Sequence, residues 1–250
     1  SMEMFDWRDY NNGIIAFDAG YVRPILAAIH MVIDDGRVAF IDTGSNDSLP
    51  NVLEALNKVG LGRDAVDFVI LTHIHLDHAG GAGVLMREFP NAKLVVHPRG
   101  SRHMAEPSKL VAGVTAVYGK EYVDTVYGDI LPIPAERIID AHEGLTIQLG
   151  SRQLLMIDTP GHAKHHICIV DQKARAIFSA ESTASLPLLA KNTLPMPAGA
   201  SAATRSASSK ALGWPIWKGG AKSISAAWAW MAAVMRGRLW PAFTHHRPAT

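Results

Sequence analysis

Three histidines and an aspartate lie within six consecutive positions of this chain. The stretch "ILTHIHLDHAGGAG", residues 70–83, contains His73, His75, Asp77 and His78. Imidazole nitrogens and a carboxylate oxygen are ligands that suit zinc, and also iron or manganese. Alternate side chains of an extended segment share a face, so His73, His75 and Asp77 are expected to point the same way. His78 is expected to turn towards them where the strand ends. The spacing therefore predicts a metal site.

The segment before this cluster is expected to be a buried strand. "VDFVILT", residues 66–72, is a short continuous apolar run of the kind that fills a strand covered on both faces. The cluster would then follow the C-terminal end of that strand. Gly80, Gly81 and Gly83 let the backbone turn tightly beside it without a steric penalty.

Strand and helix patterns surround the cluster on both sides. Strands are expected at 14–18 and 25–33, with a hairpin turn at Asp35-Gly36, and a helix begins after the capping residue Ser48. Later in the chain, helices with loops are expected over 99–127, followed by a run of short strands up to residue 181. Strands in two blocks with helices between them favour two packed sheets with helices outside.

Three motifs together resemble a known family. "HIHLDH" at 73–78 resembles the HxHxDH signature of the metallo-β-lactamase-fold hydrolases. "FIDTG" at 40–44 and "IDTPGHAKHH" at 157–166 resemble an earlier and a later segment of that family, in the family's order. The resemblance covers about residues 10–181. It implies a four-layer αββα sandwich, here a single domain over 1–250, with a two-metal site at the sheet edges.

The resemblance also implies a ligand set. His73, His75 and His162 would hold the first metal ion, and Asp77 and His78 would belong to the second. Two divalent ions, zinc first with iron or manganese as alternatives, would share a water and lower its pKa to about 7. The resulting metal-bound hydroxide would attack the substrate, and Asp77 would be the catalytic group that accepts and returns the proton.

Two further residues are expected to support these ligands. Asp42 is similar to the family's carboxylate that orients a ligand histidine by a hydrogen bond, although a turn-capping aspartate is an equal alternative from local sequence. His165 and His166 follow His162 on what is expected to be a strand. His166 is expected to face the site from behind the ligands, and its neighbour to face away.

The chain departs from the family pattern after the "IFS" strand. Where the family has a metal-bridging aspartate, this chain has Glu181, which carries the same charge on a stem one methylene longer. Glu181 either bridges the metals with some displacement or misses them. The last expected ligand is a C-terminal histidine, and His245 is the better match of the pair His245-His246. An exposed terminal histidine pair is the alternative.

This departure coincides with a change in composition. Residues 182–250 contain eight Lys or Arg and no Asp or Glu. The segment is either a divergent, basic cap over the site or the product of a shifted reading frame, since a frame error would abolish motif and composition at one point.

Composition and charge narrow the classes of protein. The 250-residue chain has 48% hydrophobic residues, a formal net charge of +1 and a single cysteine, Cys168, which rules out an internal disulfide and a thiolate-rich zinc site. We expect a cytoplasmic protein, because no signal peptide is visible and no apolar run could span a bilayer. A small-molecule substrate is expected, without nucleic acid or membrane partners; the oligomeric state is not indicated.

The leading functional hypothesis is a metal-dependent hydrolase acting on an ester, lactone or related acyl bond. Hydrolysis of β-lactams, thioesters or phosphoesters is the alternative within the same fold, because substrate choice depends on loops rather than on the fold. An iron-dependent redox enzyme and a catalytically impaired metal-binding protein are alternatives of another class.

Overall fold

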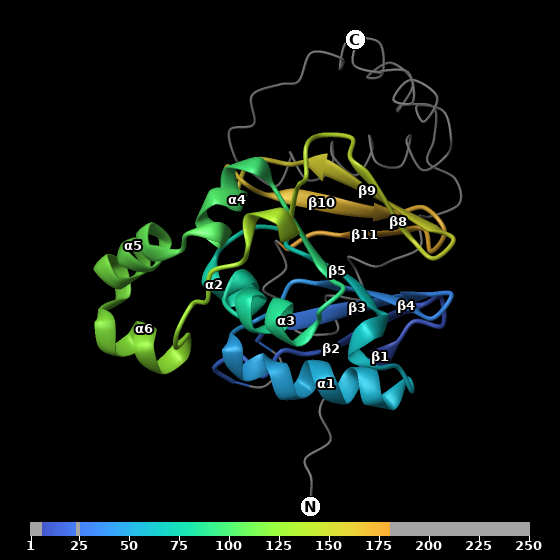
Figure 1. Cartoon of the computed structure of the whole chain (residues 1–250), viewed down its shortest axis with the longest axis horizontal. Coiled ribbons are helices and arrows are strands. Elements are labelled where there is room, and N and C mark those ends of the chain that lie inside the picture. Colours follow the sequence, from blue (N-terminus) through green and yellow to red (C-terminus); the bar gives the residue numbers. More distant parts are fainter. Residues whose placement is uncertain (1–6, 24–25, 181–250) are drawn as a thin grey trace, which may run out of the picture.

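The computed structural model describes residues 7–23 and 26–180, which form two β-sheets and a set of helices (Figure 1). The larger sheet has seven strands in chain order: β1 (Trp7–Asp9), β2 (Ile14–Asp18), β3 (Ala28–Asp34), β4 (Arg37–Ile41), β5 (Val66–Ile70), β6 (Lys93–Val96) and β7 (Ile138–Asp140). The smaller sheet has the order β11-β10-β9-β8, from β8 (Thr146–Leu149), β9 (Arg152–Asp158), β10 (Ile167–Asp171) and β11 (Ala176–Phe178).

The larger sheet changes direction at its centre. Strands β1 to β4 pair antiparallel, whereas β4 to β7 pair parallel. The predicted hairpin at Asp35-Gly36 is confirmed: Asp34 pairs with Arg37, and both turn residues have positive φ, 50° and 72°. Aspartate and glycine suit such a turn, because both tolerate the left-handed region.

Helices connect the strands of the larger sheet. The α-helices are α1 (Leu49–Lys58), α2 (Leu76–Ala79), α3 (Ala82–Glu88), α4 (Pro98–Ala105), α5 (Ser108–Tyr118) and α6 (Lys120–Val126); short 3-10 turns span Asn46–Ser48, Arg63–Ala65 and Ala135–Arg137. The helix expected after Ser48 is confirmed as α1, with Ser48 at its N-cap and Pro50 in its first turn. None of the described helices is long and apolar enough to cross a bilayer.

Two cores hold these layers together. One lies between the larger sheet and its helices, where Phe40 of β4 stacks on Phe89, which follows α3, at 5.6 Å between ring centroids. The other lies between the two sheets and includes Ile70 of β5 and Met156 of β9. Figure 1 shows α1 and α3 on the face of the larger sheet that points away from the smaller one. Two packed sheets with helices outside are thus confirmed.

The helices expected over 99–127 are confirmed as α4, α5 and α6. Figure 1 shows α5 and α6 projecting from the body of the molecule beside α2. No side chain of α5 is buried, although three of its apolar residues pack in part against the helix-side core. The atypical segment 182–250 lies outside the described residues.

Candidate metal centre

The clustered ligand-type residues occupy a loop and a short helix. Strand β5 ends at Ile70, so His73 and His75 lie in the loop that follows it. Asp77 and His78 lie in helix α2, whose first turn is closed by the amide of His78 donating to the carbonyl of His75 at 2.9 Å. The expectation that strand alternation aims Asp77 is therefore wrong, because the chain leaves the extended conformation before that residue.

His162 joins His73 and His75 from the other sheet. It lies in the loop between β9 and β10, whereas the other two follow β5. One nitrogen of each imidazole lies within 4.8 Å of the corresponding nitrogens of the other two. The ring centroids of His73 lie 4.6 Å from His75 and 5.0 Å from His162, and Nδ1 of His75 is 3.1 Å from Nε2 of His162. Three side chains from two sheets thus converge on one point.

His73 has a nitrogen free for a metal ion. The Asp42 carboxylate can only accept hydrogen bonds. The Thr72 hydroxyl therefore donates its single proton to this carboxylate, at 2.9 Å. The same hydroxyl oxygen lies 3.1 Å from Nδ1 of His73 and accepts the proton of that nitrogen. Nε2 is then an unprotonated acceptor, buried and without a hydrogen-bond partner among the described residues. Such an orphaned acceptor is costly, and a metal ion would satisfy it.

The protonation of His73 agrees with this role. Burial first, and then the neighbouring imidazoles, lower its pKa far below the usual range. Its ring is therefore neutral, as a metal ligand must be. The residues present fit a divalent ion bound by three imidazoles.

Asp42 connects the ends of β4 and β5. It is buried, with a left-handed φ of 61°, and its Oδ1 accepts the amide of Thr72 at 2.9 Å. Its Oδ2 accepts Nδ1 of His78, also at 2.9 Å. The hydrogen bond between carboxylate and imidazole expected from the resemblance is present in this geometry, and it fixes the orientation of the His78 ring.

Asp77 and His78 form a second group beside the trio of imidazoles. Nε2 of His78 is 3.3 Å from Oδ2 of Asp77, and the His78 ring lies 4.3 Å from the His73 ring. Burial would lower the pKa of His78, but the charges and hydrogen bonds of Asp42 and Asp77 raise it to about 10. Burial would raise the pKa of Asp77, but His78 outweighs it and holds that pKa below its ordinary value.

His165 and His166 both lie against the cluster. Their ring centroids are 6.3 Å and 5.5 Å from that of His73. The expectation that one of them faces away is wrong, because β10 begins only at Ile167 and both histidines lie in the preceding turn. Nδ1 of His165 accepts the amide of Ile74 at 3.3 Å. His166 is buried and bonds Thr159 through Nδ1 at 2.8 Å, while its Nε2 has no partner within the described ranges.

Comparison with known proteins assigns the family. Residues 24–211 match the Metallo-beta-lactamase superfamily. The chain belongs to the metallo-beta-lactamase superfamily. The resemblance drawn from the three sequence motifs is thereby confirmed.

Three relatives within this superfamily are 26%, 28% and 29% identical to this chain over the aligned residues. ST1585, a metallo-beta-lactamase fold-containing protein of Sulfurisphaera tokodaii, is 26% identical over 163 residues, covering 63% of this chain and 58% of its own length. Its solved structure aligns with a TM-score of 0.54 at 26% identity over 67% of this chain and 62% of that one, which confirms the expected fold class. An acyl-coenzyme A thioesterase, MBLAC2, of Gallus gallus is 28% identical over 199 residues, covering 72% of this chain and 66% of its own.

A third relative is a hydroxyacylglutathione hydrolase of Stenotrophomonas maltophilia. It is 29% identical over 156 residues, which cover 62% of this chain and 45% of the relative. The chain spans 58% and 60% of the first two curated relatives it matches.

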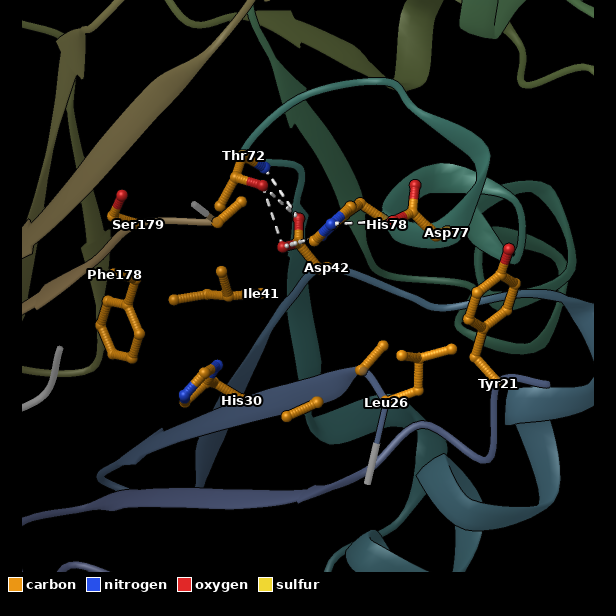
Figure 2. A pocket seen from close by; sticks show the side chains of 13 residues that line it. Tyr21, Leu26, His30, Ile41, Asp42, Thr72, Asp77, His78, Phe178 and Ser179 are labelled. Carbon is orange, nitrogen blue, oxygen red and sulfur yellow. Dashed lines mark hydrogen bonds and ion pairs between the residues drawn. The ribbon is translucent and has the colours of Figure 1, made fainter. Parts of the chain in front are cut away.

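A pocket adjoins the metal centre of this superfamily member. Figure 2 shows Asp42, Thr72, His78 and Asp77 along one side of it, with Tyr21 next to Asp77. The opposite end carries His30 and apolar side chains. His30 is buried, which lowers its pKa to about 4, and its ring contacts Phe178 edge-on at 5.2 Å; both observations are typical of a histidine with a structural role.

Two expected ligands lie outside the described residues, Glu181 and His245. Thr72, Thr159 and His165 were not expected at the site from the sequence. A threonine at a strand end and one before Pro-Gly are common turn residues and give no chemical signal. His165 was assigned to the wrong face of a strand that begins two residues later.

Proposed function

We propose that this protein is a metal-dependent hydrolase that cleaves the acyl bond of an ester, a lactone or a thioester. The observation that carries the proposal is the convergence of His73, His75 and His162, with Nε2 of His73 buried and unpaired. Three imidazoles beside a carboxylate are a typical ligand set of hydrolytic zinc sites.

The proposed ligands divide into two groups. His73, His75 and His162 would hold one divalent ion, and Asp77 and His78 would contribute to a second, which would replace the proton now on Nε2 of His78. Zinc is proposed first, although iron and manganese also accept these ligands. Bound ions would lower the pKa of a water and polarise the acyl carbonyl. Glu181 and His245 complete the proposed set by resemblance.

The chain's own groups have distinct tasks in this proposal. Asp77 is unprotonated, because His78 holds its pKa low, and its Oδ atoms can accept a proton from the attacking water and return it to the leaving group. Asp42 keeps the His78 ring oriented through Nδ1. The hydroxyl of Thr72 orients the His73 ring in the same way, because it hydrogen-bonds Nδ1 of that ring.

The preference for an acyl bond is supported by the names of two relatives. The Gallus gallus protein is an acyl-coenzyme A thioesterase, and the Stenotrophomonas maltophilia protein is a hydroxyacylglutathione hydrolase. Both act on bonds to an acyl group. No specific observation on this chain favours β-lactams or phosphoesters over them.

Metal content and a substrate panel test the proposal. The purified full chain is assayed with aryl esters, lactones, acyl thioesters, β-lactams and phosphotriesters, with and without added zinc. We expect zinc-dependent turnover of an acyl substrate, lost in His75→Ala by about a hundredfold or more, since a metal ligand is removed. The matched control is His142→Ala, an exposed histidine outside the cluster, which keeps the activity. Undiminished turnover in His75→Ala would refute the site.

The panel also separates the alternatives of another class. Bound iron with oxygen consumption and no hydrolysis would support the redox enzyme instead. One ion or none, without turnover of any panel member, would support the impaired metal-binding protein.

A further inference from the structure

Four large apolar side chains of the described residues are exposed to solvent. They are Val22, Val117, Tyr118 and Tyr122, with 62%, 74%, 60% and 41% of their surface exposed. Three of them lie on α5 and α6, and the fourth follows Tyr21 in the loop after β2. Scattered exposed apolar residues are ordinary, but a group of them indicates a binding surface.

A file of four tyrosines includes Tyr118 and Tyr122. The rings of Tyr21 and Tyr127 stack at 5.9 Å between centroids. Tyr127 meets Tyr122 edge-on at 6.3 Å, and Tyr122 stacks on Tyr118 at 5.4 Å. The first two are buried, with 8% and 7% exposed, whereas the outer two are open to solvent. The file therefore runs from the interior to the surface. We call these four residues the tyrosine file.

The inner end of the tyrosine file lies at the pocket of the metal centre. Tyr21 lines that pocket together with Asp77 and His78, and Figure 2 shows its ring on the side of Asp77. Burial raises the pKa of Tyr21 beyond its ordinary range, with further contributions from Tyr127 and from the charge of Asp77. The file is thus continuous with the place where the proposed reaction occurs.

The file is held in place by hydrogen bonds. The hydroxyls of Tyr21 and Tyr127 are 2.7 Å apart. The side-chain amide of Asn46 donates to the carbonyls of Tyr127 and Asp129 at 3.0 and 2.8 Å, which ties the end of α6 to the turn that follows Asp42. An aromatic surface that is fixed in advance binds a ligand at a lower entropic cost.

The loop that carries Tyr21 is strained. Val22 has φ +57°, a conformation that β-branched residues rarely adopt, and the amide of Arg23 donates to the carbonyl of Tyr21 across it at 2.6 Å. Strained backbone persists where the surrounding contacts hold it, and it is concentrated at ligand-binding sites. The Val22 side chain, adjacent in sequence to Tyr21, is exposed.

We propose that the tyrosine file binds the apolar part of the acyl group of the substrate and gives this enzyme a preference for long acyl chains. The inference rests on the proposed function. The occupant is a substrate rather than a second copy of the chain, because Tyr21 lines the pocket beside Asp77 and each ring of the file contacts the next, out to the exposed rings of Tyr122 and Tyr118. Rings that stack along a track suit an extended hydrocarbon or aromatic tail.

A series of aryl esters tests the proposal. For the zinc-loaded full chain, kcat/KM is measured with acetate, butyrate, octanoate and laurate esters of one phenol. We expect kcat/KM to rise with chain length. Tyr118→Ser and Tyr122→Ser each lower the laurate-to-acetate ratio by about three- to tenfold, the worth of one aromatic contact. Tyr118→Phe and Tyr122→Phe keep the ring and keep the ratio. Equal ratios in all five proteins would overturn the proposal.

A binding measurement separates this inference from the proposed function. If no ester, lactone or thioester of the panel is hydrolysed, the proposed function fails, and laurate binding is then measured by calorimetry. Saturable binding that is weakened in the two Ser variants supports the tyrosine file as an acyl site, whereas absent or unaltered binding refutes it. Sedimentation of the parent and Tyr118→Ser proteins detects a dimer that depends on these rings, and such a dimer would also refute it.

Discussion

Thr72 controls the protonation of His73 without being a ligand itself. Its hydroxyl donates to Asp42 and accepts from Nδ1 of His73, so the lone pair of that imidazole is left on Nε2. The amide of the same residue also donates to Asp42. Sequence reasoning can find His73 and His75 because histidine is a rare residue with an evident chemistry. Sequence reasoning cannot find Thr72, because the role of this residue depends on the position of Asp42, thirty residues earlier in the chain.

We predict that Thr72→Val weakens metal binding by about tenfold to a hundredfold, the usual cost of losing a hydrogen bond behind a metal ligand. Valine has the shape of threonine but leaves Nδ1 of His73 without an acceptor and removes the hydroxyl that donates to Asp42. Zinc affinity is measured by competition with a chromophoric chelator. Thr72→Ser restores the hydroxyl and is expected to restore most of the affinity. Equal affinity in Thr72→Val would contradict this hydrogen-bond chain.

At the scale of elements, a second polar network joins the two sheets at the end away from the metal centre. Asp34 ends β3, and it accepts the amide and hydroxyl of Ser151 at 2.8 and 2.7 Å and Nζ of Lys173 at 2.6 Å. Arg152 of β9 is buried and pairs with the buried Asp171 of β10. Charged groups buried in this way need such partners. The network therefore fixes how the smaller sheet sits on the larger one.

The Asp34 carboxylate predicts an acid-dependent stability. Burial would raise its pKa, but Lys173 and Ser151 outweigh burial and lower it to about 2, from 3.8. A lowered folded-state pKa contributes stability above pH 3.8 that is lost as the pH falls towards 2. Asp34→Asn is therefore expected to cost about 1.5–3 kcal/mol at neutral pH, as for hydrogen bonds to a charged group. The difference from the parent protein should vanish over that pH window.

Urea unfolding of both proteins across the window measures this effect. The matched control is Asp35→Asn at the exposed turn position next along the chain, where asparagine keeps the left-handed backbone. A small, pH-independent effect is expected there. If the loss of unfolding free energy in Asp34→Asn stayed undiminished at the acidic end of the pH window, the stabilising contribution of the charged Asp34 carboxylate would be disproved.

Local patterns predicted the elements better than their boundaries. The two-residue turn at Asp35-Gly36 and the start of α1 after Ser48 are set by neighbouring residues, so both could be predicted. The end of β5 could not, because a polar residue such as Thr72 continues a strand as readily as it ends one. What ends β5 at Ile70 is tertiary: the Thr72 amide donates to Asp42 instead of to a neighbouring strand.

At the scale of the whole molecule, the pairing of strands could not be predicted from the sequence. The pattern indicated two packed sheets, but not their division into seven and four strands or the change from antiparallel to parallel pairing at β4. These pairings join residues far apart in the chain, and their choice depends on packing between the layers. The motifs supplied what local patterns lack, since the family resemblance implied that His162 meets His73.

The metal centre joins the two sheets at the end opposite Asp34. His73 and His75 follow β5 of the larger sheet, and His162 precedes β10 of the smaller one. An ion bound to all three would link the sheets and bind only the folded state. Zinc at a hundred times its dissociation constant is therefore expected to raise the free energy of unfolding by about 2.7 kcal/mol. Chelation with EDTA should reverse the gain.

Urea unfolding with and without zinc measures this linkage in three proteins. Zinc is expected to raise the free energy of unfolding equally in the parent and in His142→Ala, because His142 lies outside the cluster. In His75→Ala the rise is expected to be small, since two imidazoles hold zinc far more weakly than three. An equal gain in His75→Ala would mean that zinc stabilises the fold from another site. A loss of the gain confined to His75→Ala would identify the imidazole trio as the link between the sheets, independently of any substrate.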